Sequence, residues 1–395
     1  MPRVNRSRQF HEPFHVAVLA ADVAAEAALV LGSYGNARVT GPFRRRGGVA
    51  GQRWRLVIAV QKRMEGFLGG APRFHDPPND STLVAAGTAL FEMLFTGDVR
   101  RLYDEARATA GRRRIDLVLT SMIDWVAAAP WELLYDPTRR SFLALEDVHL
   151  VRNVFTAVPA ELPAARPAPL RVLLAVAQPS DFAPLSSKEE MASIRQAWAP
   201  LGDSGRVEIT HVPRATAEKL QRRLGSGRFD VLHFVGHGTH DDTVGGALLL
   251  EDDAGKSRPM DHTALRRLLV RRGVSLVFLN TCESGRGSRL AFSRGLAPAL
   301  LAGGVPATVA NQFAVGDQAA VRFAREFYRS LAEGKTLGEA ALEARLAVAP
   351  APGHSSLDWL VPVLFARNPG DVLCTSRPKQ GRSGAKRRGP VSEVS

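Results

Sequence analysis

Apolar runs and amphipathic segments alternate through the second half of the chain. Short apolar runs bounded by turn residues predict buried strands, and apolar positions three and four residues apart predict helices packed on a sheet. The predicted strands are residues 170–177, 207–212, 229–235, 274–280 and 307–312. The predicted helices are residues 188–198, 215–224, 262–271, 293–302, 317–332 and 337–347. This order favours an α/β fold with a mostly parallel central sheet and helices on both faces.

The remaining apolar segments are harder to assign. Residues 247–255 resemble a hairpin, and we expect residues 359–366 to pack beside or onto the sheet. In the first half of the chain, residues 14–21, 54–60 and 115–120 are predicted strands, and residues 83–95 and 99–108 are predicted helices.

A proline-rich segment divides the chain. Residues 157–170, AVPAELPAARPAPL, hold four prolines, which preclude a regular helix. We therefore expect a flexible N-terminus (1–13), an N-terminal region (14–156), a linker (157–169), an α/β domain (170–374) and a disordered basic tail (375–395).

Composition narrows the class of protein. With 45% hydrophobic and 23% charged residues, the chain is typical of a globular protein. We expect neither a membrane span nor a secretory signal, because no apolar run reaches about 18 residues and the first 14 residues are polar and basic. Cys282 and Cys374 are the only cysteines, so no disulfide framework is available. These features predict a reducing, cytoplasmic setting, in which a lone cysteine is a candidate nucleophile.

The net charge of +13 raises the question of nucleic-acid binding. Residues 377–395 carry six basic residues and one acidic residue, which is +5 of that total, in a Gly-, Ser- and Pro-rich tail typical of disorder. A second cluster, residues 44–46, lies beside two glycines. Neither cluster is interleaved with aromatic residues for base stacking. We interpret the basicity as solvated surface with weak attraction to polyanions and expect no specific nucleic-acid binding.

His237 and Cys282 are the candidate catalytic residues. Each directly follows a predicted buried strand, and sites in open α/β sheets form at the carboxyl ends of strands. A histidine beside a cysteine can take the thiol proton and later protonate a leaving amine. We expect Gly236 to turn the chain off the strand and Gly238 to leave its N–H open. The N–H groups of Gly238 and Cys282 would then form an oxyanion hole.

The blocks that contain these two residues resemble a known family. His233–Gly238 (HFVGHG) and residues 279–285 (LNTCESG) resemble the signature blocks of the CHAT family, caspase- and separase-related cysteine peptidases of clan CD. Further segments match in order, and the resemblance spans about residues 83–369. They are AGGVP at 302–306, VGD at 315–317, FYRSL at 327–331, Trp359 and PWELL at 130–134. The His-to-Cys spacing is also close to that of caspases, although the caspase pentapeptide around the cysteine is absent.

The resemblance implies a caspase-like fold whose N-terminal half is a pseudo-caspase-like region. It also implies hydrolysis of selected peptide bonds through a thioacyl intermediate. Activation is expected from a separate regulatory protein or from the N-terminal half. The leading prediction is an intracellular cysteine endopeptidase acting on a protein substrate in bacterial defence or regulated cell death. The alternative is a catalytically silent adaptor that binds a partner through the same groove.

Several residues keep two interpretations. Cys282 is a nucleophile or a small buried apolar residue, and His237 is catalytic or a turn residue bonded to backbone. Asp317 matches an acidic residue of separases, which cut after arginine, and so is a substrate-binding candidate; it equally suits a helix N-cap. Glu283 is a lesser substrate-binding candidate. His233 favours a structural role, and no Cys/His spacing indicates a metal site or any cofactor.

Overall fold

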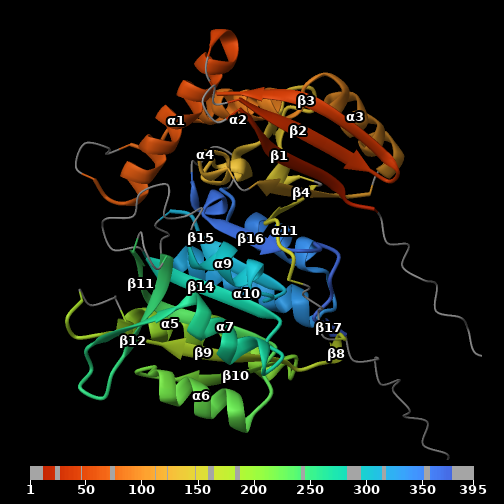
Figure 1. Cartoon of the computed structure of the whole chain (residues 1–395). Coiled ribbons are helices and arrows are strands. Elements are labelled where there is room, and N and C mark those ends of the chain that lie inside the picture. The colour runs from red at the N-terminus through yellow and green to blue at the C-terminus, as the bar shows by residue number, and fades with distance from the viewer. Residues whose placement is uncertain are drawn as a thin grey trace, which may run out of the picture.

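The computed structural model describes residues 12–22, 27–45, 47–71, 76–111, 113–121, 123–146, 148–158, 164–182, 187–241, 245–282, 295–313, 317–350 and 356–375. The described helices and strands are arranged around one large sheet (Figure 1). The predicted flexible N-terminus and basic tail lie almost entirely outside these ranges and stay predictions.

The 13-stranded sheet runs through both halves of the chain. In spatial order, its main path is β10 (Val207–Val212), β9 (Leu170–Val176), β11 (Val231–Asp241), β14 (Leu276–Cys282), β15 (Ala307–Asn311), β16 (Pro362–Ala366), β7 (Val148–Asn153), β4 (Ile115–Ser121), β1 (Phe14–Asp22), β2 (Ala27–Tyr34) and β3 (Ala37–Arg44). Strands β10 to β15 on this path are parallel, as are β16, β7, β4 and β1, whereas β15 and β16 are antiparallel. The predicted mostly parallel α/β sheet is confirmed.

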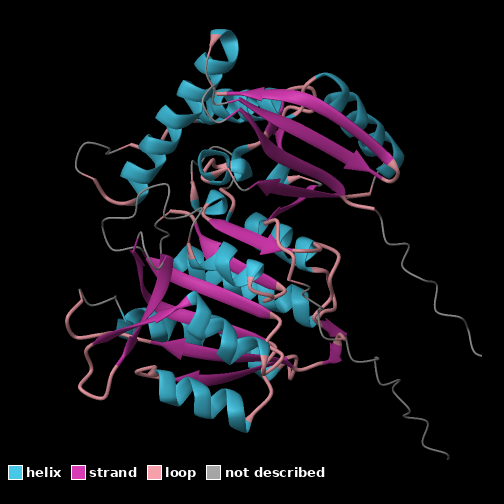
Figure 2. Ribbon diagram, viewed as in Figure 1, coloured by secondary structure: helices cyan, strands magenta, loops and turns pink. Residues whose placement is uncertain are grey.

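Helices cover both faces of the sheet in the second half (Figure 2). One face carries α5 (Ser187–Asp203), α10 (Asp317–Ala332) and α11 (Leu337–Val348), and the other carries α6 (Ala217–Ser226), α7 (His262–Val270) and α9 (Leu296–Ala302). Neighbouring strand residues alternate between the two apolar clusters, as Val231 and Leu232 do in β11. Burial on both faces explains why these strands are continuous apolar runs in the sequence.

In the first half, helices α1 (Gly48–Leu68), α2 (Asp80–Leu94) and α3 (Gly97–Ala110) cover one face of the sheet. In Figure 1, α2 and α3 lie behind β1–β3, and α1 runs beside these strands on the left. Strands β1 and β2 bury Val18 and Val30 against this side, while Leu19 and Leu29 are partly exposed. Part of the first half is therefore a two-layer structure.

Several short helices and strands connect or extend the larger elements. They are α4 (Asp124–Ala127), η1 (Trp131–Leu133), β5 (Tyr135–Asp136), β6 (Ser141–Phe142), η2 (Leu143–Leu145), β8 (Arg166–Pro167), β12 (Gly245–Glu251), β13 (Ser257–Asp261), η3 (Asp358–Leu360) and β17 (Cys374–Thr375). Strands β12 and β13 form an antiparallel extension of β11, in the region predicted as a hairpin. Among the described residues no single helix is long and apolar enough to cross a membrane, and only the bent pair α2 and α3 passes by length and composition.

The main error in the predicted elements concerns residues 54–60, which form part of helix α1 and not a strand. Trp54, Val57 and Val60 are spaced by three residues and share the buried face of that helix. A short apolar run of this kind fits either a strand or a buried helix, so periodicity alone misassigned it. The strands β2, β3 and β7 were not predicted.

The last apolar segment joins the two halves. Its strand β16 lies within the sheet, antiparallel to β15 and parallel to β7, with Phe365 in register with Arg152. Within the predicted linker, β8 pairs with β17 near the end of the described chain. The division into a first region and a peptidase domain stays a prediction, and the two regions share one sheet.

Candidate active site

Strands β11 and β14 bring the two predicted catalytic positions together. They are parallel neighbours, and His237 is in register with Cys282. Parallel neighbouring strands lie about 4.8 Å apart, so the two backbone positions are adjacent at the carboxyl end of the sheet. Four residues earlier, the register partners His233 and Phe278 stack their rings with centroids 4.6 Å apart. This stacking shows that residues in register on β11 and β14 can bring their side chains into contact.

The strand ends differ from the predicted ones. His237 lies inside β11, because the strand continues to Asp241 and pairs there with β12; Cys282 is the last residue of β14. His237 is paired on both sides and is only 3% exposed, and its ring lies 5.4 Å from that of Phe182. The backbone of His237 therefore lies between two neighbouring strands, β14 and β12.

Gly236 has a different role from the predicted one, since the chain does not turn there. A Cβ at this position would lie 2.6 Å from Phe234 Cζ and 3.0 Å from the carbonyl oxygen of Ala177. Only glycine therefore fits this close approach of β11 to its surroundings. Gly238 lies opposite Leu248 of β12, still within the hairpin.

A small cavity of about 60 Å³ opens one residue away from the two predicted catalytic positions. Its lining is uncharged and includes Gly238 and Thr281, with α9 residues Leu296 and Pro298. Because Leu279 and Leu296 belong to the apolar cluster under α7 and α9, this cavity lies on that side of the sheet.

His233 is a structural residue of the core. It is 2% exposed, and its Nδ1 lies 2.6 Å from the hydroxyl oxygen of Tyr328 on α10. Its ring also meets that of Trp198 on α5 edge-on, at 5.1 Å. Burial lowers the pKa of His233 to about 3 and raises the pKa of Tyr328, so both groups are neutral at neutral pH.

The predicted substrate-binding residues are only partly described. Asp317 is the first residue of α10, and its side chain lies outside the description. Glu283 lies outside the described residues altogether. Within the described ranges, no group of three or more His, Cys, Asp or Glu residues could hold a metal ion.

Residues not predicted from the sequence also belong to this edge of the sheet. Asn311 of β15 donates a hydrogen bond of 3.1 Å to Asn280 of β14, two residues before Cys282. Next to it, Gln312 contacts the buried carboxylate of Glu132 from the first half of the chain. Glu132 lies in the PWELL segment. A charged residue between apolar ones was the only feature of the sequence that could have indicated a buried carboxylate there.

Comparison with known proteins assigns the family. The CHAT domain model matches residues 84–367, which is most of the chain. The chain belongs to the CHAT domain family. The resemblance inferred from its signature blocks is confirmed, and with it the caspase-like class of fold.

Three solved structures are similar to this CHAT protein. Separase of Saccharomyces cerevisiae, in complex with securin, has 10% identity and a TM-score of 0.47 over 90% of this chain and 30% of that one. The Arg-specific cysteine proteinase gingipain R has 13% identity and a TM-score of 0.46 over 70% of this chain and 68% of that one. RgpB of Porphyromonas gingivalis, with its pro-domain, has 12% identity and a TM-score of 0.41, with 80% and 78% covered. No curated relative matches the chain significantly.

Proposed function

We propose that this protein is a cysteine endopeptidase in which Cys282 is the nucleophile and His237 the general base and acid. The register of His237 with Cys282, the last pair of the parallel β11–β14 ladder, is the observation that carries the proposal. Membership of the CHAT family supports it.

The chemistry follows from these two groups. His237 removes the thiol proton of Cys282, and the thiolate sulfur attacks the carbonyl carbon of the scissile peptide bond. The N–H groups of Gly238 and Cys282 are the proposed donors to the resulting oxyanion. The carbon–nitrogen bond then breaks as His237 protonates the leaving amine, and water hydrolyses the thioacyl intermediate to release the acid and the thiol.

Cys374 provides an internal contrast. Its side chain is buried where β17 pairs with β8, and burial, together with the carboxylate of Asp230, raises its pKa to about 11. At neutral pH this thiol is protonated and enclosed, which makes it a poor nucleophile. Cys374 therefore serves as the control for any experiment that labels or removes Cys282.

Selectivity and control belong to the same proposal. Asp317 is the proposed carboxylate for a basic side chain before the scissile bond, as the resemblance to separases implies, and Glu283 is a lesser candidate for the same role. Control by a separate regulatory protein and a role in bacterial defence or regulated cell death rest on that resemblance as well, whereas the proposed intracellular site of action rests on the composition of the chain.

The test is a peptide-library cleavage screen with basic residues represented before the scissile bond. We expect cleavage by the wild-type protein and by Cys374→Ala, and none by Cys282→Ala. An alkylating thiol probe should label Cys282 much faster than Cys374. Cleavage that persists in Cys282→Ala would refute the assignment of the nucleophile. Undiminished biological activity of Cys282→Ala, with no cleavage by any variant, would favour the adaptor instead.

A further inference from the structure

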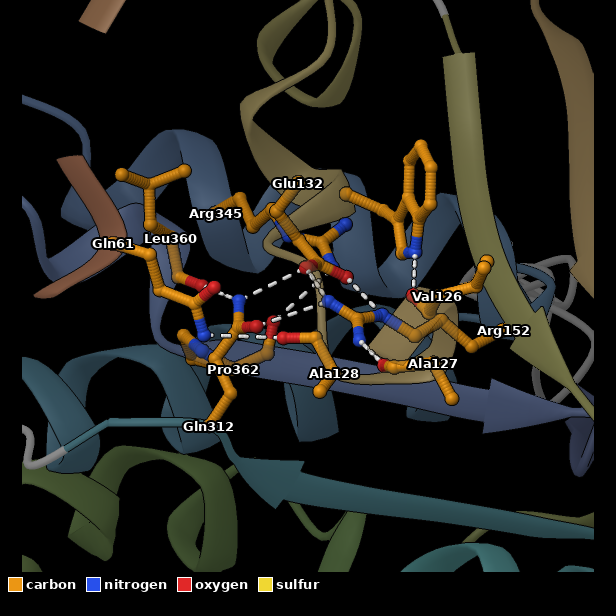
Figure 3. A network of polar contacts seen from close by, with 11 residues as sticks. Gln61, Val126, Ala127, Ala128, Glu132, Arg152, Gln312, Arg345, Leu360 and Pro362 are labelled. Atoms are coloured by element: carbon orange, nitrogen blue, oxygen red, sulfur yellow. Dashed lines mark hydrogen bonds and ion pairs between the residues drawn. The ribbon is translucent and has the colours of Figure 1, made fainter. Parts of the chain in front are cut away.

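A buried polar cluster centred on Glu132 connects the first half of the chain to the end of β15 (Figure 3). The Glu132 carboxylate is fully buried and accepts hydrogen bonds from Arg152 Nε, at 3.1 Å, and from Arg152 Nη2. It also accepts a bond of 2.9 Å from Gln312 Nε2, and Arg345 Nη2 lies 4.0 Å away. Figure 3 shows these side chains converging from η1, β7, α11 and, for Gln312, the residue that directly follows β15.

The charges in this cluster make its geometry specific. A buried carboxylate is costly unless it is paired and hydrogen-bonded, and removing one partner leaves the other charge uncompensated. Here two guanidinium groups, from Arg152 and Arg345, surround the one carboxylate of Glu132. Both arginines are almost fully buried. The carboxylate is therefore the group that allows the two cations to lie together between the two halves.

Gln312 is the residue through which this cluster reaches the site. Its amide donates to Glu132 and, at 2.6 Å, to the carbonyl oxygen of Leu360, and its side-chain oxygen accepts a bond of 3.0 Å from Arg152. Its backbone N–H donates to Val361. Every polar group of this side chain is thus used, and Gln312 is fixed directly after the last residue of β15.

The end of β15 lies beside the end of β14. Leu279 is in register with Ala310, and the hydrogen bond between Asn311 and Asn280 continues this register by one residue. One further step places Gln312 level with Thr281, the residue before Cys282. The position of the nucleophile is therefore supported by β15, and the end of β15 is held by Glu132.

The cluster extends further into the first half. Arg152 Nη1 donates to the carbonyl oxygen of Ala127 at 3.0 Å, and Gln61 of α1 donates to that of Ala128 at 3.1 Å. A chain of hydrogen bonds and adjacent residues consequently runs from α1, through Glu132 and Gln312, to the strand that carries Cys282. Unlike apolar packing, these hydrogen bonds fix the orientation of the side chains as well as the distances between them.

We propose that Glu132 is a positioning residue for Cys282, acting through Gln312 and the end of β15. The proposal rests on the proposed peptidase function. It assigns the first half of the chain a part in catalysis, since displacement of Glu132 moves the end of β15 away from the geometry that aligns Cys282 with His237. A misplacement of about 1 Å at a reacting group can reduce the rate about 100-fold.

Two isosteric variants test this role, each made in a Cys374→Ala background. Glu132→Gln removes the carboxylate charge, and Gln312→Glu places a second carboxylate against Glu132. We expect each to lower kcat about tenfold or more with little change in KM, because the bound substrate is unaffected but the nucleophile is misaligned. Alkylation of Cys282 should slow in the same variants without any substrate present.

The pH profile of Gln312→Glu separates positioning from general destabilisation. Two adjacent carboxylates raise the pKa of one of them, and the protonated form restores a donor toward Glu132. The ratio of its kcat to that of the Cys374→Ala parent should therefore rise as pH falls from about 8 to about 6. A ratio that stays flat, or a loss of activity that only follows the unfolded fraction, overturns the proposal.

Asp230→Asn is the matched control. Asp230 is another buried carboxylate, paired with Arg166 at 2.9 Å, but it lies at the opposite end of β11 from His237. It should lower thermal stability and leave kcat unchanged. If Asp230→Asn lowers kcat as much as Glu132→Gln does, the effect is one of stability and the positioning role is refuted. If the parent itself cleaves no peptide and its Cys282 does not react, the proposed peptidase function fails independently of Glu132.

Discussion

The buried imidazole of His233 makes a quantitative prediction about stability and pH. In the folded chain its pKa is about 3, whereas in an unfolded chain a histidine has a pKa of about 6.5. Between these values the unfolded state binds a proton that the folded state excludes. The contribution of neutral His233 to the free energy of unfolding is therefore fully present above about pH 6.5 and is lost as the pH falls toward 3.

The size of the effect follows from the same values. Each pH unit below about 6.5 costs about 1.4 kcal/mol, so the His233 contribution between pH 7 and pH 5 is about 2 kcal/mol. The side chains in contact with the imidazole are Tyr328, Phe278 and Trp198, none of which carries a charge at these pH values. Burial alone is thus responsible for the shift.

The assay compares the double variant His233→Phe, Tyr328→Phe with the wild type by urea unfolding at several pH values, followed by tryptophan fluorescence. Replacing both partners avoids leaving a buried hydroxyl without a hydrogen bond. We expect the difference in unfolding free energy to move by about 2 kcal/mol in favour of the variant on going from pH 7 to pH 5. A difference that is independent of pH would show that His233 is not held neutral, and the reasoning would be refuted.

Two further substitutions test local features of the fold. Gly236→Ala should destabilise the chain by about 1–3 kcal/mol and reduce any cleavage activity, because the added methyl group meets Phe234 and Ala177 beside His237; thermal unfolding at wild-type temperature would contradict this. Thr336→Ala removes the capping box at the start of α11 and should cost about 1 kcal/mol in urea unfolding with cleavage unchanged, and an unchanged midpoint would contradict the role of the cap.

Much of the second half of the fold was predictable because its strands are buried on both faces. The strand at 207–212 and the helix at 317–332 coincide with β10 and α10. The register of His237 with Cys282 also follows the expectation for neighbouring parallel strands, although the sequence pattern ended each strand too early. Alternating glycines at 236 and 238 resemble a turn, and the pairing with β12 that keeps β11 extended is a contact between separate segments.

The first half was less predictable for a related reason. β2 and β3 form an antiparallel hairpin with one exposed face, so their apolar positions are interrupted, and the turn is marked only by Gly35 and Asn36. In α1, by contrast, an apolar run between residues 54 and 60 carries the composition of a strand but the burial of a helix. The pattern of apolar residues along the chain shows whether a segment is buried on one face or on both. It does not show as clearly whether the segment is a strand or a helix.

The Glu132 cluster is the part of the site furthest from sequence prediction, because its four main side chains come from positions 132, 152, 312 and 345. Nothing in their spacing indicates that they meet. The sheet topology explains why they meet. Strand β16 lies between β15 and β7, so the strands of the second half adjoin those of the first half at this point. Under the positioning role proposed for Glu132, a change at η1 would reach β15 through the hydrogen bond between Glu132 and Gln312. Protection of the β15 amides from hydrogen exchange should therefore fall in Glu132→Gln and not in Asp230→Asn.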